Sequence, residues 1–254
     1  MRKIWQSLLA IIVFVLLWWL LSALSSSTLL PNPRQAAEAF IRLLTAPKGM
    51  FHVRVTVARV FVGTALGALV GIVLGVATHY IRAVEVAVRS VVYPLFQTVP
   101  TICWALLFIL WIGLEEITPV LIIAVAAAPL FIINVWEGMK ELDTNLIEMA
   151  SSYSRNPFKV LGKVVMPMLY PYVFAAVRSG FMVAWKIVIP AEIFGATSGM
   201  GRMLSNAFHS YQITNVFGWI LVFAVILIFF DYVVFNFIDR KFVRKWKPKQ
   251  LKPL

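Results

Sequence analysis

Charged side chains inside apolar sequence are the residues of this chain with the clearest chemistry. Arg178 and Lys186 lie within the apolar run 168–189, and Glu192 follows Pro190, where we expect the helix to break. A charge within a bilayer is unfavourable and usually faces the bundle interior or a water-filled path. At a rise of about 1.5 Å per residue, Arg178 stands about 16 Å into this span, near the membrane midplane. The three residues are therefore candidates for a translocation path, and the two basic side chains favour an anion as its cargo.

Each of these residues also has a structural interpretation, and the sequence leaves both open. Arg178 could instead pair with a backbone carbonyl or a carboxylate, and Lys186 could extend its amine to the external interface. Glu192 could anchor a gate or hinge, or it could be the structural partner of a basic residue. Arg59 lies near the outer end of an earlier apolar run, and we expect it to mark the membrane interface.

Patterns for covalent or metal chemistry are weak in this sequence. Ser198 lies between Gly195 and Gly199, an arrangement similar to the nucleophile motif of intramembrane serine proteases, but the spacing is one residue too long. The nearest candidate base, His209, lies in the same connecting segment, so we interpret the segment as a loop with a tight glycine turn. The three histidines are scattered along the chain and Cys103 is the single cysteine, so we predict no metal site.

A phosphate-binding loop is also missing from the sequence. Gly162 and Lys163 are followed by Val164, and Pro157 stands where the first glycine of that motif would be. We therefore expect that this chain does not hydrolyse ATP itself, and we predict no catalytic residue.

The polar segment 141–167 has a helical pattern of its own. Its apolar residues follow helical spacing, and Asn145 with Glu148 has the spacing of a capping box, which predicts a helix start. Asn156 and Pro157 predict the end of this helix and the start of a second short one that leads to the next span. A short helix with basic flanks could lie on lipid or dock onto a protein in water, and its residues alone leave these interpretations even.

The elements that hold these residues are long apolar runs. Of the 254 residues, 61% are hydrophobic and 13% are charged, whereas soluble domains have roughly 45–50% and 25%. Runs of about 20 residues match the thickness of a bilayer core. We predict an all-α polytopic membrane protein with one bundle over 1–254. The expected spans are 4–24, 55–78, 91–113, 117–136, 168–189 and 214–238, with a short amphipathic helix at 34–45.

The N-terminus is similar to a signal peptide, because basic residues precede an apolar run. That run is longer than the usual core of roughly 7–15 residues in such peptides. We favour a retained first membrane helix, which ends at the serines 25–27.

Lysine and arginine are unevenly distributed between the loops. Fifteen of the 23 lie in segments on the same side as the N-terminus, five lie in the opposite loops, and three lie within spans. Because cytoplasmic loops carry the excess of basic residues, both termini and the segment 137–167 are predicted to be cytoplasmic. The net charge of +12 is thus interpreted as a topology signal and as contact with anionic lipid, not nucleic acid.

Four glycines recur at every fourth position of the second span, at Gly63, Gly67, Gly71 and Gly75. This spacing places them along one helix face, where a neighbouring backbone can approach closely. We expect helix packing within the bundle, with a subunit contact or a hinge facing a pore as alternatives.

The segment 148–167 resembles the EAA loop of permease subunits of ABC importers. The pattern of that loop is Glu-Ala-Ala, three residues, Gly, nine residues, Ile, one residue and Leu-Pro, and five residues here are in register with it: Glu148, Ala150, Val164, Met166 and Pro167. Met149 replaces the first alanine, and Ser154 stands at the glycine position. The serine implies a turn that relies on Asn156 and Pro157 instead of a left-handed glycine.

Further stretches resemble the branch of these permeases that handles nitrate, sulfonate, taurine and bicarbonate. They stand in the same order and spacing over nearly the whole chain, at 30–33, 59–63, 94–100, 111–115, 191–192 and 198–201. The resemblance implies the fold of a type I ABC importer permease, in a bacterial inner membrane, that takes up a small anion.

The resemblance also implies partners and roles. The cytoplasmic loop would dock in a groove of a separate ATPase subunit, which binds ATP and Mg²⁺, and this chain would bind no cofactor. The residues implied for this coupling are Glu148, Ala150, Ser154, Pro157 and Pro167. Two permease copies, expected as a homodimer, would form the path, and an extracytoplasmic solute-binding protein would deliver the substrate.

Two other functions compete with this interpretation. An ion-coupled secondary transporter needs no ATPase and usually has two related halves, but the sequence has no such repeat. A membrane-embedded enzyme needs a nucleophile–base or metal pattern, and the weak patterns at Ser198 and His209 argue against it.

Overall fold

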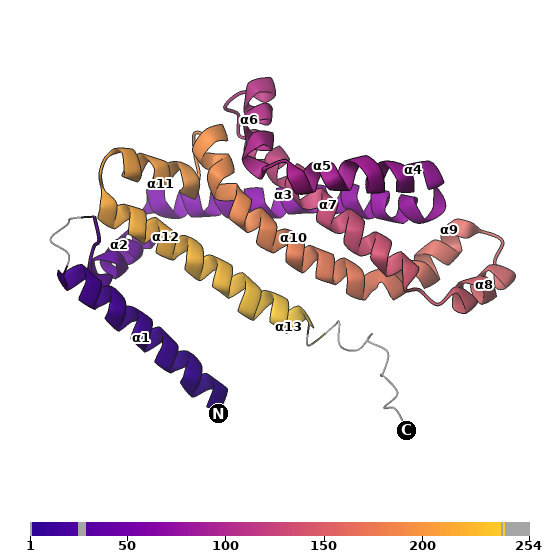
Figure 1. Ribbon diagram of the computed structural model, residues 1–254, viewed down its shortest axis with the longest axis horizontal. Helices are drawn as coiled ribbons and strands as arrows, with labels where there is room; N and C mark the ends of the chain where they lie inside the picture. The colour runs from indigo at the N-terminus through magenta and orange to yellow at the C-terminus, as the bar shows by residue number, and fades with distance from the viewer. Residues whose placement is uncertain (1, 25–28, 240, 242–254) are drawn as a thin grey trace. The chain divides into compact units, whose positions relative to one another are not determined.

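The computed structural model describes residues 2–24, 29–239 and 241, and every secondary-structure element in them is helical (Figure 1). The α-helices are α1 (Arg2–Leu24), α2 (Pro33–Thr45), α3 (Pro47–Tyr80), α4 (Arg82–Ala87), α5 (Tyr93–Thr98), α6 (Thr101–Ile112), α7 (Thr118–Lys140), α8 (Thr144–Tyr153), α9 (Pro157–Val160), α10 (Met166–Gly195), α11 (Met200–His209), α12 (Ile213–Ile228) and α13 (Asn236–Ile238). Three π-helical turns join them, η1 (Val88–Val92), η2 (Leu161–Val165) and η3 (Phe229–Phe235). The prediction of an all-α chain is confirmed. The basic tail at 242–254 and the predicted end of the first span at 25–27 lie outside the described residues.

Four helices of the described chain are long and apolar enough to cross a membrane, namely Pro47–Tyr80, Thr118–Lys140, Pro157–Gly195 and Ile213–Ile238. A fifth candidate is a bent pair, Arg82–Phe96 with Thr101–Ile112. The first predicted span, 4–24, is present as the helix α1, whose stretch Ile12–Leu24 is a shorter apolar helix. The expected count of six spans is therefore reproduced only in part.

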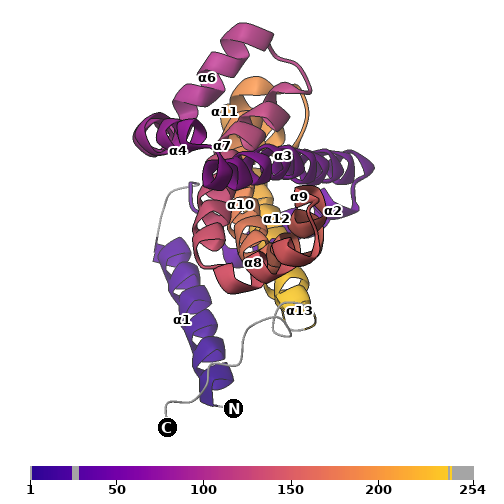
Figure 2. The same ribbon diagram turned by 90° about the vertical axis from the view of Figure 1, so that its right-hand side faces the viewer.

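The predicted span 91–113 is not one continuous helix, because the chain bends by 95° between α5 and α6. Val99 is extended, with φ −79° and ψ 119°, and Pro100 follows it. A residue before proline avoids the helical region, since the proline ring would clash with it. Thr101 then begins a new helix, and α6 turns away from the direction of α4 and α5 (Figure 2).

The expected helix break at Pro190 is also wrong. The helix α10 passes through Pro171 and Pro190 and ends at Gly195. Membrane helices tolerate proline because neighbouring groups satisfy the freed carbonyls. The predicted span 168–189 is part of a longer helix, since Pro157–Gly195 is one helix of 39 residues. The π turn η2 lies just before Pro167, where the missing amide of the proline interrupts α-helical hydrogen bonding.

The chain divides into two compact units, Met1–Thr56 with Ser198–Ile226 and Val57–Thr197 with Leu227–Leu254. In the first unit, the Arg34 amide donates to Asn32 at 2.7 Å and the Asn32 amide donates to Gln35 at 3.1 Å. This complete capping box starts α2, so the helix predicted at 34–45 is confirmed. Trp18 of α1 stacks on Phe217 of α12, with the ring centroids 5.9 Å apart.

In the second unit, α7 packs along α10, and the two helices enclose most of the core. Phe131 of α7 is fully buried between Ala127 and Ala176, and its ring lies over Gly180 of α10. Close packing of this kind holds membrane helices together, because lipid offers no hydrophobic driving force between them. The helices α8 and α9 lie at the end of α10 that holds Met166 (Figure 1, Figure 2).

The four glycines of α3 face α7. A Cβ atom at Gly63 would lie 2.7 Å from the Cβ of Ile123, and one at Gly67 would lie 2.7 Å from the carbonyl oxygen of Ala124. Gly71 and Gly75 meet Phe131 and Val135 in the same way. Because these glycines recur every four residues, their missing side chains leave a groove along α3, and the backbone of α7 packs into it.

Candidate functional site

The polar loop that precedes α10 is built by two side-chain caps. The Asp143 carboxylate accepts a hydrogen bond from the Asn145 amide at 2.9 Å and so starts α8. The predicted start at Asn145 is therefore wrong by two residues. After α8, Ser154 is extended, with φ −140° and ψ 115°, and the Asn156 side chain accepts from the amide of Phe158 at 3.0 Å. The turn thus uses Asn156, with no left-handed residue at position 154.

The apolar stripe of α8 divides between two surroundings. Leu142, which directly precedes the helix, is buried, and Ile147 packs against the same core cluster. In contrast, four large apolar side chains of α8 and α9 are exposed, and the exposed fraction reaches 89% for Tyr153 and 81% for Phe158; the set is Leu146, Met149, Tyr153 and Phe158. We call these four residues the loop patch. Its side chains have an apolar surface that no described part of the chain covers.

The residues predicted for coupling lie around this patch. Glu148 and Pro157 are exposed, whereas Ala150, Ser154 and Pro167 are half-buried. Glu148 lies on α8 next to Met149, and Pro157 directly precedes Phe158. Pro167 lies farther along, where the helix Pro157–Gly195 runs into its apolar part. The sequence predicted the apolar stripe of this helix, but helical spacing did not show which of its residues the bundle covers.

Arg178 pairs with an acidic residue that the sequence reasoning missed. Its Nε and Nη2 atoms both donate to Oδ1 of Asp231, at 3.0 and 2.7 Å. The pair joins α10 to η3, and the Arg178 side chain keeps 37% exposure. Arg178 thus pairs with a carboxylate, which was one of the two structural alternatives, the other being a backbone carbonyl. Asp231 is the only charged residue of the predicted span 214–238, which was a usable signal.

Glu192 is the structural partner of a basic residue. Its side chain is fully buried, and Oε1 accepts a hydrogen bond from Nη1 of Arg59 at 2.7 Å. Nη2 of Arg59 donates to Oε2 of Glu116, which lies in the connection between α6 and α7. Arg59 is itself only 4% exposed, so it is a buried ion-pair residue.

Lys186 differs from the other two path candidates. It is exposed, and no acidic partner for it occurs in the part of the chain that the structure describes. Arg178, Lys186 and Glu192 do not contact one another. The three candidates thus share α10 but have separate surroundings, and only Lys186 presents a charge without an internal partner.

The segment between α10 and α11 is a capped turn. Gly199 has φ 104°, its amide donates to Nδ1 of His52 at 3.1 Å, and the Met200 amide donates to Thr56 at 2.8 Å. Both acceptors come from α3 and satisfy the first amides of α11. Nδ1 of His209 lies 2.8 Å from the carbonyl oxygen of Ser205, one turn earlier on the same helix. The interpretation of this segment as a glycine turn agrees with these contacts.

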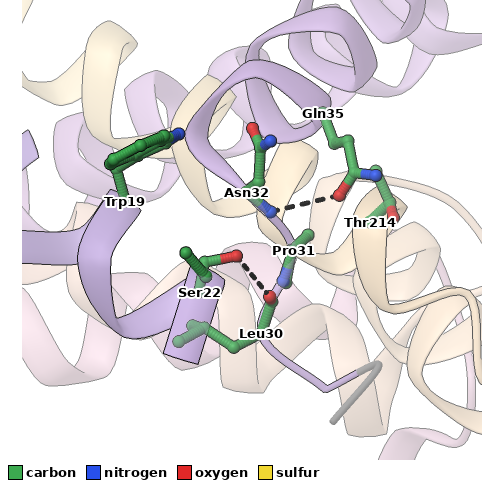
Figure 3. A pocket seen from close by; sticks show the side chains of 8 residues that line it. Trp19, Ser22, Leu30, Pro31, Asn32, Gln35 and Thr214 are labelled. Carbon is green, nitrogen blue, oxygen red and sulfur yellow. Dashed lines mark hydrogen bonds between the residues drawn. The ribbon is translucent and has the colours of Figure 1, made fainter. Parts of the chain in front are cut away.

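A cavity of about 530 Å³ opens in the first unit between α1, α2 and the start of α12 (Figure 3). Ser22 donates to the carbonyl of Leu30 at 3.0 Å, and the Asn32 amide is held by Gln35, so several of its polar groups are already bonded. Its lining holds no charged side chain: Trp19, Ser22, Ala23, Leu30, Pro31, Asn32, Gln35 and Thr214. It therefore lacks the cation that a bound anion would need. In the described residues, no group of three or more His, Cys, Asp or Glu side chains is placed to hold a metal ion.

Residues 63–248 match the family model of the binding-protein-dependent transport system inner membrane component. The chain belongs to this family. It is 29% identical over 244 residues to the putative aliphatic sulfonates transport permease protein SsuC of Bacillus subtilis strain 168, covering 95% of this chain and 87% of that protein. It is 26% identical to the taurine transport system permease protein TauC of Escherichia coli K12, covering 89% of this chain and 84% of that protein. It is 22% identical to the nitrate import permease protein NrtB of Synechocystis, covering 84% of this chain and 80% of that protein.

A solved structure shows the same fold. A chain of the MetNI methionine ABC transporter in an inward-facing conformation matches with a TM-score of 0.65 at 20% identity, over 83% of this chain and 99% of that chain. The resemblance to ABC importer permeases of the sulfonate, taurine and nitrate branch is thus confirmed. The chain is a multi-pass membrane permease with the fold of a type I importer subunit.

Proposed function

We propose that this chain is the permease subunit of an ATP-driven importer and that the loop 137–167 couples it to a separate ATPase subunit. The observation that carries the proposal is the loop patch, which is apolar, exposed and located at one end of the helix Pro157–Gly195. Exposed apolar patches on a water-facing segment mark sites of protein contact. The positive-inside distribution supports a cytoplasmic location for this segment, with both termini on the same side.

The coupling would run along one continuous helix. Glu148, Ala150 and Ser154 belong to the docking helix α8 and its end, and Pro157 starts the long helix that becomes α10. A force on α8 would cross the turn 154–156 and then pass through α9 and η2 to α10, because no loop interrupts Pro157–Gly195. Hydrolysis of ATP, with its Mg²⁺, would take place on the partner, since this chain has no phosphate-binding loop.

The cargo would be a small anion. The relatives above carry names for aliphatic sulfonates, taurine and nitrate. Lys186 on α10 is exposed without an acidic partner in the described chain, so it is the strongest candidate to meet an anion in the path. Arg178 is a second candidate through its exposed part. We assign Glu192 to a positioning role, because it is buried against Arg59.

Three further partners follow from the proposal. The family description names transport that depends on a binding protein, which we place on the external side as the supplier of the anion. A second copy of this chain would complete the path as a homodimer. Membrane lipid surrounds the single permease domain 1–254 in a bacterial cytoplasmic membrane.

The test is charge reversal on the docking helix. The chain is co-expressed with its ATPase, purified in lipid nanodiscs, and assayed for assembly and ATP hydrolysis with and without Glu148→Arg. Glu141→Arg is the matched control, because Glu141 is exposed and precedes α8 in the same loop. We expect Glu148→Arg to lose assembly or coupling while membrane insertion persists, and Glu141→Arg to keep both.

The opposite result would favour a different class. If no ATPase associates with the native chain, the loop would be a helix on the lipid surface, and an ion-coupled secondary transporter would explain the membrane fold and the charged residues of α10 better than an importer. If the Glu148→Arg complex hydrolyses ATP and couples like the native complex, Glu148 is not part of the docking contact.

A further inference from the structure

Arg59 shares its guanidinium between two carboxylates with very different surroundings. Nη1 donates to Glu192, whose side chain is fully buried, and Nη2 donates to Glu116, whose side chain is 61% exposed. One carboxylate already balances the charge of Arg59. The second adds a negative charge at a position open to water, so it can leave the pair without exposing Glu192 or leaving it without a cation.

Glu116 lies in a short connection outside the helices. The connection between α6 and α7 begins at Gly113, which has φ 90°. The Gly113 carbonyl accepts a hydrogen bond from the hydroxyl of the buried Thr118 at 2.9 Å. Residues 114–117, between these two ends, are outside any helix. Because most of the Glu116 side chain is exposed, it can swing outward by rotation about its own side-chain bonds.

A second donor faces the same carboxylate. The Thr197 hydroxyl, just after α10, donates to Oε1 of Glu116 at 3.3 Å, while Arg59 holds Oε2. The two oxygens of Glu116 thus lie against one guanidinium arm and one hydroxyl. One guanidinium arm with a neighbouring hydroxyl offers two hydrogen-bond donors to planar or tetrahedral oxyanions such as carboxylate, nitrate or sulfonate.

We propose that the Glu116 carboxylate occupies a binding site for the oxyanion group of the transported solute and that the solute displaces it. This inference rests on the proposed function, in which the chain conducts a small anion. The exchange replaces one anion by another, so Arg59 stays paired and Glu192 stays neutralised throughout. The released Glu116 enters water, where most of its side chain already lies.

The arrangement gives each residue a distinct role. Arg59 and Thr197 would contact the oxyanion, Glu192 would position Arg59 from the buried side, and Glu116 would close the empty site. A neutral or cationic solute without oxyanion acceptors could not replace Glu116, because it would leave Nη2 of Arg59 and the Thr197 hydroxyl without an acceptor. The site would therefore select for oxyanions at its entry.

The experiment measures equilibrium binding of taurine, methanesulfonate and nitrate to the complete complex in nanodiscs by calorimetry. We expect Glu116→Gln to bind at least one of these anions about tenfold more tightly than the native protein. The factor follows if the internal carboxylate leaves about a tenth of the sites open, because apparent affinity scales with that fraction. Ethanolamine, which lacks the oxyanion, should bind neither protein.

Glu115→Gln is the matched control. Glu115 is an exposed carboxylate on the same loop, so its removal changes the local net charge equally without touching Arg59 or Thr197. A second pair tests the hydroxyl: Thr197→Val should weaken anion binding severalfold, while Thr197→Ser should retain it. Arg59 is left intact, because its removal would strand the buried Glu192 and destabilise the fold.

Three results would overturn the site. These are unchanged affinity in Glu116→Gln, an equal gain in Glu115→Gln, or no binding of any of the three anions to either protein. The proposed coupling is judged separately, since the Glu148→Arg assay reads assembly and ATP hydrolysis and involves none of these residues. If the anion-binding results contradict the site while the Glu148→Arg assay supports coupling, the chain would remain an importer permease with a different anion site.

Discussion

Arg178 donates two hydrogen bonds to the same carboxylate oxygen of Asp231, from Nε at 3.0 Å and from Nη2 at 2.7 Å. Asp231 lies in the π turn η3, where the chain makes a wider turn than an α-helix. The ion pair joins α10 to the last apolar helix within sequence that is otherwise nearly free of charge. The two opposite charges, each unfavourable in apolar surroundings, thus neutralise each other.

Breaking this pair should destabilise the protein modestly. We expect Asp231→Ala to lower the free energy of unfolding by about 1–2 kcal/mol, the upper range for polar contacts between membrane helices. The Arg178 side chain is only partly buried, at 37% exposure, which keeps the loss small. Reversible unfolding in mixed micelles measures it. The double variant Arg178→Ala/Asp231→Ala is the control, and a strictly additive sum of the two single losses would contradict a direct interaction.

The pair also shows what the sequence could not supply. The unusual charges of Arg178 and Asp231 are both visible in the apolar runs, and Arg178 was singled out from them. Their contact was not visible, because 53 residues separate them and the π turn sets the direction of the Asp231 side chain. The same holds for Arg59 and Glu192, which are 133 residues apart. Charge inside an apolar run predicts that a partner exists but not which residue it is.

The groove between α3 and α7 gives a second prediction. Gly71→Ala should lower the free energy of unfolding by about 1–3 kcal/mol, as overpacking does in a close-packed interior. The new Cβ would meet the Cβ of Phe131 and would lie 2.7 Å from the carbonyl oxygen of Ala128, and neither belongs to a flexible side-chain end. Unfolding in mixed micelles again provides the measurement.

Gly162 is the matched control for this change. It is also a helical glycine, but a Cβ there would meet nothing within 4 Å. Gly162→Ala should therefore leave stability unchanged or raise it by about 0.4–1 kcal/mol through lower entropy of the unfolded chain. Equal losses at both positions would mean that backbone conformation, not the approach of α7, explains the glycine pattern.

Element boundaries show where sequence reasoning succeeded and where it failed. The apolar runs predicted the long helices well, because burial in lipid requires both length and helical hydrogen bonding. Proline was the main source of error. Pro100 bends the chain by 95°, whereas Pro190 leaves α10 unbroken. Whether a proline breaks a membrane helix depends on its neighbours in space, which the local sequence does not contain.

The start of α8 gives a third prediction, which separates two similar residues. Asp143→Ala should destabilise the first turn of α8 by about 1 kcal/mol, because its carboxylate accepts the Asn145 amide. Asn145→Ala should have a much smaller effect, although its spacing to Glu148 suggested a capping box. Hydrogen exchange of the amides of residues 144–147 measures local opening. Faster exchange in Asn145→Ala than in Asp143→Ala would restore the original sequence interpretation.

The loop patch gives the last prediction. Tyr153→Ser and Phe158→Ser should each weaken association with the ATPase by about 2 kcal/mol or more, since aromatic anchors dominate the binding energy of interfaces. Both side chains are more than four-fifths exposed, so the isolated permease should keep its unfolding midpoint. Co-purification and titration of the ATPase onto permease nanodiscs measure the loss. Ser151→Ala, an exposed change on α8 outside the patch, is the control and should bind normally. If both aromatic variants bind the ATPase like the native chain but detach the loop from anionic vesicles, the patch contacts lipid and the docking assignment is wrong.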